Sequence, residues 1–369
     1  MKSFVSKKTA EYLEKHVDDM VDLLCRCVKL KPSIPTDREL IGLSCDDYVA
    51  SRVNKLCMPN TRFLKERALR KKNSKVTPWC CILVKYGVHL FLWIDRFGEK
   101  AYPFFEKAKS MGFDGVEIPV PATDASKVNV SKTRRALEDA EISCTLSVGL
   151  NPKNNILSAS KTTRMKGVEY LKKCVDISAE LGSDMIAGVL YGAWGVLVGR
   201  GRTQKEWDRS VAAFKEVCRY AQGRGVDLAV EPLNRFEVYF LNTTSDAVKY
   251  VKAVDEPNAK IHLDTFHMNI EEKNFYDPII EAGDMLGHVH ACENDRGIPG
   301  TGHVNWDEVY RGLSQIKYNR WITIESFVPD MKEMAAMTAI WRQIAPSADA
   351  IASDGLKFLK EMEKKYPLA

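Results

Sequence analysis

Short apolar runs recur between residues 85 and 326, and each is followed by an amphipathic segment rich in lysine. Such runs predict strands that are buried on both faces, and apolar positions at helical spacing predict helices that cover them. The starts of the predicted strands lie 27 to 43 residues apart, the length of one strand–helix unit. The eight predicted strands are residues 87–93, 115–120, 142–148, 185–190, 226–231, 260–264, 287–291 and 321–326.

The alternation of strands and helices predicts an α/β protein. Eight strand–helix units in about 285 residues fit a closed (β/α)8 TIM barrel, which we expect to span residues 84–369. One predicted helix, residues 162–181, ends at Gly182, a residue type that often terminates helices. The alternative is an open doubly wound sheet, which usually carries a glycine-rich phosphate-binding turn after its first strand. Residues 93–96, Trp-Ile-Asp-Arg, do not form such a turn.

Residues 1–83 differ from the rest of the chain. In this segment, apolar positions at helical spacing predict a first helix that ends before Pro32 and Pro35. A second short helix is predicted between residues 61 and 70. Two such helices are too few for an independent hydrophobic core, so we expect a helical N-terminal extension. It is basic, with 17 Lys and Arg against 10 Asp and Glu, and it holds six of the ten cysteines.

The net charge of the whole chain, +5, comes from this extension, because residues 84–369 hold 37 Lys and Arg against 39 Asp and Glu. The overall charge therefore does not indicate nucleic-acid binding, and no nucleic-acid partner is expected. No run of 18 apolar residues predicts a membrane span, and the N-terminus is too polar for the core of a signal peptide. We expect a cytoplasmic protein with reduced cysteines, which lack the paired CxxC spacing of zinc and redox motifs.

Four successive predicted strands end in side chains that can bind a metal ion. Glu231 ends the fifth strand, Asp264 the sixth, His290 lies at the end of the seventh, and Glu325 lies at the end of the eighth. In a TIM barrel the active site lies at the C-terminal ends of the strands, so we expect these side chains to converge. A single charged residue at a strand end is commonly solvated, but four on consecutive strands favour a metal site.

Three carboxylates and one imidazole form a donor set made mostly of oxygen. This composition favours a divalent cation such as Mn²⁺, with Co²⁺ or Mg²⁺ as alternatives, over copper or a structural zinc. His262 and His288 point the same way as Asp264 and His290 but lie one layer deeper, because side chains alternate along a strand. The favoured interpretation is a pair of hydrogen-bonded core histidines, and orientation of a metal ligand is the alternative.

The loops after the strands add further polar and aromatic groups that can face a bound polyol. The candidates for substrate binding are Glu237, His267, Arg296, Trp93 and Trp194. The alternative for the three charged or polar groups is a solvated loop side chain, and for the aromatic rings a role in closing the barrel mouth. Residues 297–302 read as a flexible turn without the lysine of a phosphate-binding loop.

The segments that carry these residues resemble those of the ketose 3-epimerases, which belong to the xylose isomerase-like barrel superfamily and include the D-tagatose, D-allulose (psicose) and L-ribulose 3-epimerases. Residues 85–89 and 112–117 also look like the first two units of that family. The resemblance extends over about residues 85–365. The most specific segments are 229–237 (AVEPLNRFE), 262–269 (HLDTFHMN), 288–297 (HVHACENDRG) and 324–327 (IESF).

The resemblance implies that Glu231, Asp264, His290 and Glu325 are the metal ligands. It also implies that Glu231 and Glu325 form the acid/base pair of the reaction. The family further implies a homodimer or homotetramer. These roles agree with the convergence that the strand ends predict.

The same resemblance assigns the substrate contacts. Glu237, His267 and Arg296 match positions that bind oxygens near C1 to C3 of the sugar. Phe97 stands where the family often has a second tryptophan, so the distal end of the substrate is not assigned. The resemblance implies a free ketohexose or ketopentose of the D-allulose/D-fructose, D-tagatose or L-ribulose type.

The expected reaction is inversion of C3 through a cis-enediolate. The C3 hydrogen is weakly acidic because it is next to the C2 ketone, and a metal ion that chelates O2 and O3 stabilises the enediolate. One carboxylate removes the proton and the second returns a proton to the opposite face. The alternatives within the superfamily are an aldose–ketose isomerase and an inosose dehydratase-like lyase. An endonuclease IV-like nuclease and a non-catalytic sugar-binding protein are less favoured.

Family members normally begin near residue 85, which implies that residues 1–83 are an addition. One explanation is an upstream-extended reading frame, in which the codon for Val84 is the natural start. The other is a genuine helical appendage that contacts other subunits or anionic partners. The change in charge and in cysteine density near residue 84 motivates both.

Overall fold

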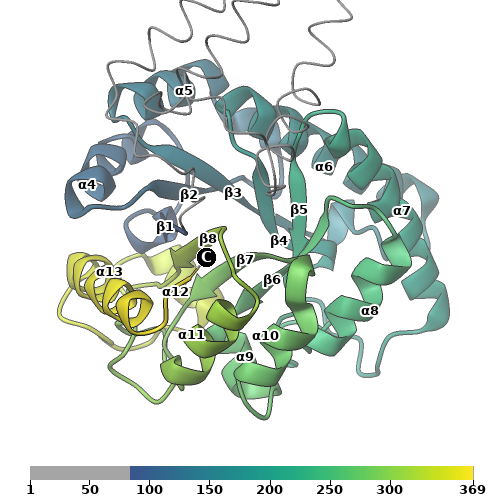
Figure 1. Cartoon of the computed structure of the whole chain (residues 1–369). Coiled ribbons are helices and arrows are strands. Elements are labelled where there is room, and N and C mark those ends of the chain that lie inside the picture. The colour runs from purple at the N-terminus through teal and green to yellow at the C-terminus, as the bar shows by residue number, and fades with distance from the viewer. Residues whose placement is uncertain (1–83, 369) are drawn as a thin grey trace, which may run out of the picture. The chain divides into compact units, whose positions relative to one another are not determined.

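The structure is a computed structural model that describes residues 84–368, and these form a closed barrel of eight parallel strands (Figure 1). Each strand pairs with the next in the chain, and β8 pairs with β1. The TIM barrel expected from the apolar runs is therefore confirmed, whereas the predicted helical extension, residues 1–83, lies outside the described residues. The strands are β1 Lys85–His89, β2 Gly115–Pro119, β3 Ser143–Leu150, β4 Met185–Ala193, β5 Asp227–Val230, β6 Ala259–Asp264, β7 Leu286–Ala291 and β8 Trp321–Ile324.

Helices follow the strands and surround the barrel (Figure 1). The α-helices are α4 Pro103–Met111, α5 Val130–Asp139, α6 Lys161–Leu181, α7 Gln204–Gln222, α8 Thr244–Val254, α9 Thr265–Glu271, α10 Tyr276–Ala282, α11 Trp306–Gln315, α12 Lys332–Thr338 and α13 Ala348–Lys365. Short 3₁₀ helices are η2 Leu90–Leu92, η3 Glu99–Ala101, η4 Ala125–Lys127, η5 Pro152–Asn154 and η6 Gly283–Met285. No helix among residues 84–368 is long and apolar enough to cross a membrane.

The local sequence explains where the helices begin and end. Helix α6 begins after Ser160, whose side chain accepts a hydrogen bond from the backbone N–H of Thr163. It ends at Gly182, which adopts a left-handed conformation with φ of +75° that glycine tolerates without steric cost. The predicted helix 162–181 is thus confirmed to within one residue.

Strand β1 is shorter than predicted. It ends at His89 instead of continuing to residue 93, because the side chain of His89 caps a 3₁₀ helix. Its Nδ1 atom accepts a hydrogen bond from the backbone N–H of Phe91, at 3.1 Å. The apolar residues of η2 look like a continued strand in sequence, although they turn the chain away from the sheet.

The barrel interior contains polar side chains as well as apolar ones. Strands β2, β4, β7 and β8 are buried along their whole length. Several polar residues on the strands are nonetheless fully buried, among them Glu117, Thr145, His262, His288 and Thr323. A buried polar group is costly unless it has a partner, so this interior must supply partners for these side chains.

Candidate metal centre and active site

The four predicted metal-binding residues converge at the C-terminal ends of β5 to β8. Their polar atoms approach closely: His290 Nδ1 lies 3.3 Å from Glu325 Oε2 and 4.0 Å from Asp264 Oδ2. Glu231, Asp264 and His290 each offer a ligand atom within 4.8 Å of the others. Asp264 and Glu325 also lie within this distance of each other, in a group with Cys292. The convergence expected from the strand order is therefore present.

The chemistry of this group fits a divalent cation. Glu231, Asp264 and His290 are almost completely buried, and Glu325 is largely so. Burial raises the pKa of Glu231 well above its ordinary value, and neighbouring Glu325 and Asp264 raise it further, although His290 opposes them. His290 Nδ1 is buried and has no hydrogen-bond partner among the described residues. A cation would satisfy that nitrogen and offset the gathered negative charge.

Arg296, a predicted substrate-binding residue, lies inside this cluster. Its Nη1 atom donates hydrogen bonds to Asp264 Oδ2 at 2.7 Å and to Glu325 Oε2 at 2.8 Å. Burial alone would raise the pKa of Glu325, but the charges of His290 and Arg296 hold it well below its ordinary range. The guanidinium also lies 4.1 Å from the ring centre of Phe266, which fixes its plane.

Asn234 connects two of the predicted substrate-binding residues. Its side-chain amide donates to Glu237 Oε1 at 2.8 Å, and its backbone N–H donates to His267 Nδ1 at 3.2 Å. Because Nδ1 accepts, Nε2 of neutral His267 carries the proton. That atom lies 3.7 Å from Glu231 Oε1 and 3.7 Å from Asp264 Oδ2. Sequence reasoning missed Asn234, although it lies in the motif that contains Glu231 and Glu237.

The predicted aromatic residue Trp194 joins the same network. Its indole N–H donates to Glu237 Oε2 at 2.9 Å. The loop after β4 is also tied to the loop after β5, because the backbone N–H of Gly195 donates to the carbonyl of Glu237 at 3.1 Å. Trp194 therefore reaches the metal centre indirectly, through a carboxylate that is itself a candidate substrate ligand.

The second predicted aromatic residue, Trp93, makes its contacts with two outer helices, and its role in substrate binding stays a prediction. Its ring stacks on Phe104 of α4, with centroids 5.4 Å apart, and its indole N–H donates to Asp349 of α13 at 2.8 Å. Trp93 directly follows η2, which begins where β1 ends at His89.

Two buried residues near the centre were not predicted. Glu117 on β2 lies with its Oε1 atom 2.6 Å from His290 Nε2. His89 at the end of β1 places Nε2 3.9 Å from Glu325 Oε1 and 3.9 Å from Glu117 Oε1. Burial lowers the pKa of His89, which keeps the ring neutral. The sequence signal that could have identified Glu117 is a carboxylate in the middle of the apolar run Val-Glu-Ile on β2.

The two deeper histidines differ from the favoured interpretation as hydrogen-bonded core residues. Neither ring nitrogen of His262 has a hydrogen-bond partner among the described residues, and its Nδ1 atom lies 3.5 Å from Glu231 Oε2. His288 Nε2 lies 2.8 Å from Glu117 Oε2. Both rings face carboxylates of the site, which agrees better with the alternative role of supporting the ligands.

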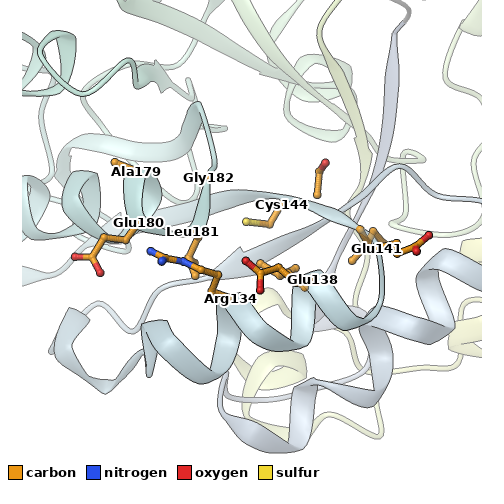
Figure 2. A pocket seen from close by; sticks show the side chains of 11 residues that line it. Arg134, Glu138, Glu141, Cys144, Ala179, Glu180, Leu181 and Gly182 are labelled. Atoms are coloured by element: carbon orange, nitrogen blue, oxygen red, sulfur yellow. The ribbon is translucent and has the colours of Figure 1, made fainter. Parts of the chain in front are cut away.

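A pocket lies at the end of the barrel where the strands begin, and Figure 2 shows the side chains that line it. Its volume is about 610 Å³, and it lies where β3 begins and where α5 and α6 end. Arg134, Glu138, Glu141 and Glu180 line it with charges of both signs. The strand-end carboxylates contribute nothing to it, so it is separate from the candidate metal centre.

Comparisons with known proteins find a matching family and similar sequences. A family model described as a xylose isomerase-like TIM barrel matches residues 105–362. A probable ketose 3-epimerase from Synechocystis sp. is 34% identical over 279 residues, which cover 75% of this chain and 96% of that protein. An L-ribulose 3-epimerase from Methylomonas sp. is 32% identical, with 75% and 97% of the two chains covered.

Solved structures show the same similarity. The crystal structure of a D-allulose 3-epimerase from Methylomonas sp. in complex with D-allulose matches with a TM-score of 0.72 and 31% identity. The match covers 76% of this chain and 97% of that one. A D-psicose 3-epimerase from Clostridium cellulolyticum H10, solved with D-tagatose, matches with a TM-score of 0.69 and 30% identity, over 76% and 99% of the two chains.

Proposed function

We propose that this protein inverts C3 of a free ketose. The premise is that the chain belongs to the xylose isomerase-like TIM barrel family and, within it, to the ketose 3-epimerases. The similar proteins named above are isomerase-class enzymes, and so is this one. The observation that carries the proposal is the placement of two glutamates. Glu231 follows β5 and Glu325 follows β8, so they stand on either side of Asp264 and His290 in the order of strands.

Four residues would hold a divalent cation in this enzyme: Glu231, Asp264, His290 and Glu325. The set of three carboxylates and one imidazole supports Mn²⁺ first, with Co²⁺ or Mg²⁺ as alternatives. When bound, the cation stabilises negative charge that develops on the oxygens of C2 and C3 of the sugar. The unpartnered His290 Nδ1 and the raised pKa of Glu231 support a cation at this place.

The two glutamates would move the proton at C3. The C3–H bond is weakened by the adjacent C2 ketone, so a carboxylate oxygen of one glutamate can take the proton and leave an enediolate of the sugar. The carboxylic acid of the other glutamate then donates a proton to the opposite face of C3. After one turnover the first glutamate holds a proton and the second has lost one, so both return to their starting states by proton exchange with water. The two glutamates exchange roles in the reverse direction.

The network around Asn234 and Arg296 would orient the sugar. Glu237 and His267 are tied together by Asn234, and they offer an acceptor and a donor to sugar hydroxyl groups. Arg296 offers donors beside Asp264 and Glu325. We propose that these three residues bind the oxygens near C1 to C3, and that Trp194 acts through Glu237. D-Allulose, D-fructose, D-tagatose and L-ribulose are the sugars to test.

The proposal is tested by incubating the full chain with Mn²⁺ in deuterium oxide and each of these ketoses in turn. The expected result is a 3-epimer product that carries deuterium at C3, seen by NMR. Deuterium at C1 alone would show an aldose–ketose isomerase instead, and loss of water would show a lyase. The absence of exchange with all four sugars would contradict the proposal.

The remaining expectations concern the surroundings of the enzyme. We propose a homodimer or homotetramer that acts in the cytoplasm on a small sugar, without nucleic acid or membrane. Several apolar side chains are exposed on the described part of the chain, including Phe236 and Leu197 in the loops beside the site. Exposed apolar residues of this kind suit an interface between subunits. Light scattering after size-exclusion chromatography measures the oligomeric state.

A further inference from the structure

Glu117 is a fully buried carboxylate at the centre of the barrel, and its surroundings explain how it is tolerated. It lies on β2, whose five residues are all buried, and its side chain has no exposed surface. An ionised carboxylate in such a place is costly unless several donors reach it. Two groups do: His290 Nε2 lies 2.6 Å from Oε1, and Thr145 Oγ1 donates to Oε2 at 2.8 Å. His288 Nε2 also lies 2.8 Å from Oε2, although it makes no hydrogen bond there.

These contacts join β2 both to its neighbour β3 and to β7, which is not its neighbour. Thr145 lies on β3 and stands opposite Glu117 in the parallel register of β2 and β3. His288 and His290 lie on β7, which pairs with β6 and β8 but not with β2. The carboxylate therefore spans the barrel interior, with Thr145 fixing it on one side and the two histidines on the other.

The ring of His290 presents one nitrogen to Glu117 and the other to the metal centre. Nε2 faces Glu117, whereas Nδ1 lies 3.3 Å from Glu325 Oε2 and 4.0 Å from Asp264 Oδ2. An ionised carboxylate can accept a hydrogen bond but cannot donate one, so Nε2 must carry the proton. In the neutral ring the lone pair is then on Nδ1, the nitrogen without a hydrogen-bond partner.

We propose that Glu117 is a positioning residue, which holds His290 in the Nε2–H tautomer and aims Nδ1 at the cation beside Asp264 and Glu325. The inference rests on the proposed function, because it assumes that His290 is a metal ligand. A carboxylate behind a metal-bound histidine fixes the orientation of the ring and raises its basicity as a ligand. Thr145 supports the arrangement by holding Glu117 from the far side.

The test measures metal affinity separately from activity. Glu117→Gln keeps the size of the side chain but removes its charge, and Thr145→Val removes the hydroxyl that holds it. Each full-length variant is freed of metal with a chelator and titrated with Mn²⁺ by calorimetry. We expect Glu117→Gln to bind Mn²⁺ about 10- to 100-fold more weakly than the wild type, and Thr145→Val to lose affinity by a smaller factor.

Two readouts separate positioning from a purely structural role. The visible absorption spectrum of the Co²⁺ form should change in Glu117→Gln, because the histidine ligand is no longer held at its angle. The control is Asp227→Asn, which removes a partly buried carboxylate that pairs with Arg320 at the first residue of β5, the end of that strand opposite to the metal centre. This control should lower the melting temperature of the metal-free protein and leave Mn²⁺ affinity and the Co²⁺ spectrum unchanged.

The outcomes are distinguishable. If the wild type binds Mn²⁺ and folded Glu117→Gln binds it equally well, the role of Glu117 is refuted and the proposed function stands. If the wild type itself binds no Mn²⁺, the proposed metal centre fails and the inference fails with it. If Glu117→Gln does not fold, Thr145→Val decides, because unchanged Mn²⁺ affinity in that variant would overturn the inference.

Discussion

At the scale of single residues, Arg296 shows how the centre brings opposite charges together. Its Nη1 atom donates to both Asp264 and Glu325, and the side chain is almost completely buried. The backbone of Arg296 has φ of +64°, a left-handed conformation that costs a non-glycine residue about 1–2 kcal/mol. The hydroxyl of Ser326 donates to its carbonyl and helps to hold this conformation. Strain at a residue with so many polar contacts agrees with a role in binding substrate.

The two tryptophans allow their predicted roles in substrate binding to be tested. Trp194→Phe keeps an aromatic ring but removes the N–H that donates to Glu237, so KM for the ketose should rise by about tenfold, the effect of one hydrogen bond to a charged group. Trp93→Phe removes the bond to Asp349 and should leave KM unchanged while lowering stability by about 1 kcal/mol. Steady-state kinetics and urea unfolding measure both effects. An equal rise in KM in both variants would show that the indole N–H of Trp93 also supports substrate binding.

At the scale of elements, the start of α7 ties together the loops on which the substrate network depends. Glu206 and Thr203 form a capping box at the first turn of α7. Glu206 also accepts two hydrogen bonds from Arg200 in the loop after β4, each at 3.0 Å, and one from Tyr239 in the loop after β5, at 3.0 Å. One carboxylate thus connects the loops that carry Trp194 and Glu237.

The pH dependence of stability tests this connection. The hydrogen bonds from Arg200 lower the pKa of Glu206 to about 2, with further help from Thr203. Because the pKa in the folded state lies below its ordinary value, this carboxylate stabilises the fold above the ordinary pKa. That contribution is lost as the pH falls toward about 2. Glu206→Gln should therefore be less stable than the wild type near neutral pH.

The difference in unfolding free energy between the two proteins should shrink as the pH falls toward the lowered pKa. Urea unfolding across this range of pH gives the measurement. Glu216→Gln on the outer surface of α7, whose carboxylate pairs with Lys172, is the matched control. A pH-independent difference for Glu206→Gln would show that the carboxylate has no special role.

At the scale of the whole molecule, the fold and most of the centre follow from the sequence for a physical reason. Parallel barrel strands are buried on both faces, so they appear as apolar runs, and strand order brings their last residues to one rim. This reasoning located Glu231, Asp264 and His290. The same reasoning misplaced the end of β1, because His89 caps a 3₁₀ helix and so ends the strand within an apolar run.

Other features could not be predicted from a linear pattern. Glu117 meets His290 across the barrel interior, 173 positions away in the chain, and the two strands are not neighbours. Asn234 orients His267 and Glu237 through both backbone and side chain, which depends on the exact conformation of its loop. Contacts of this kind are set by closure of the barrel and by loop geometry.

The central claim is that Glu231 and Glu325 serve opposite faces of C3. Its most direct test is the rate of epimerisation and of C3 hydrogen exchange in deuterium oxide, measured from each 3-epimer in turn. Glu231→Gln and Glu325→Gln should each lose epimerisation by about 10²- to 10⁴-fold while remaining folded, and any residual exchange should favour a different epimer in each variant. Glu333→Gln, on the surface beside Arg96, should match the wild type. Epimerisation near the wild-type rate in either of the first two variants would contradict the account.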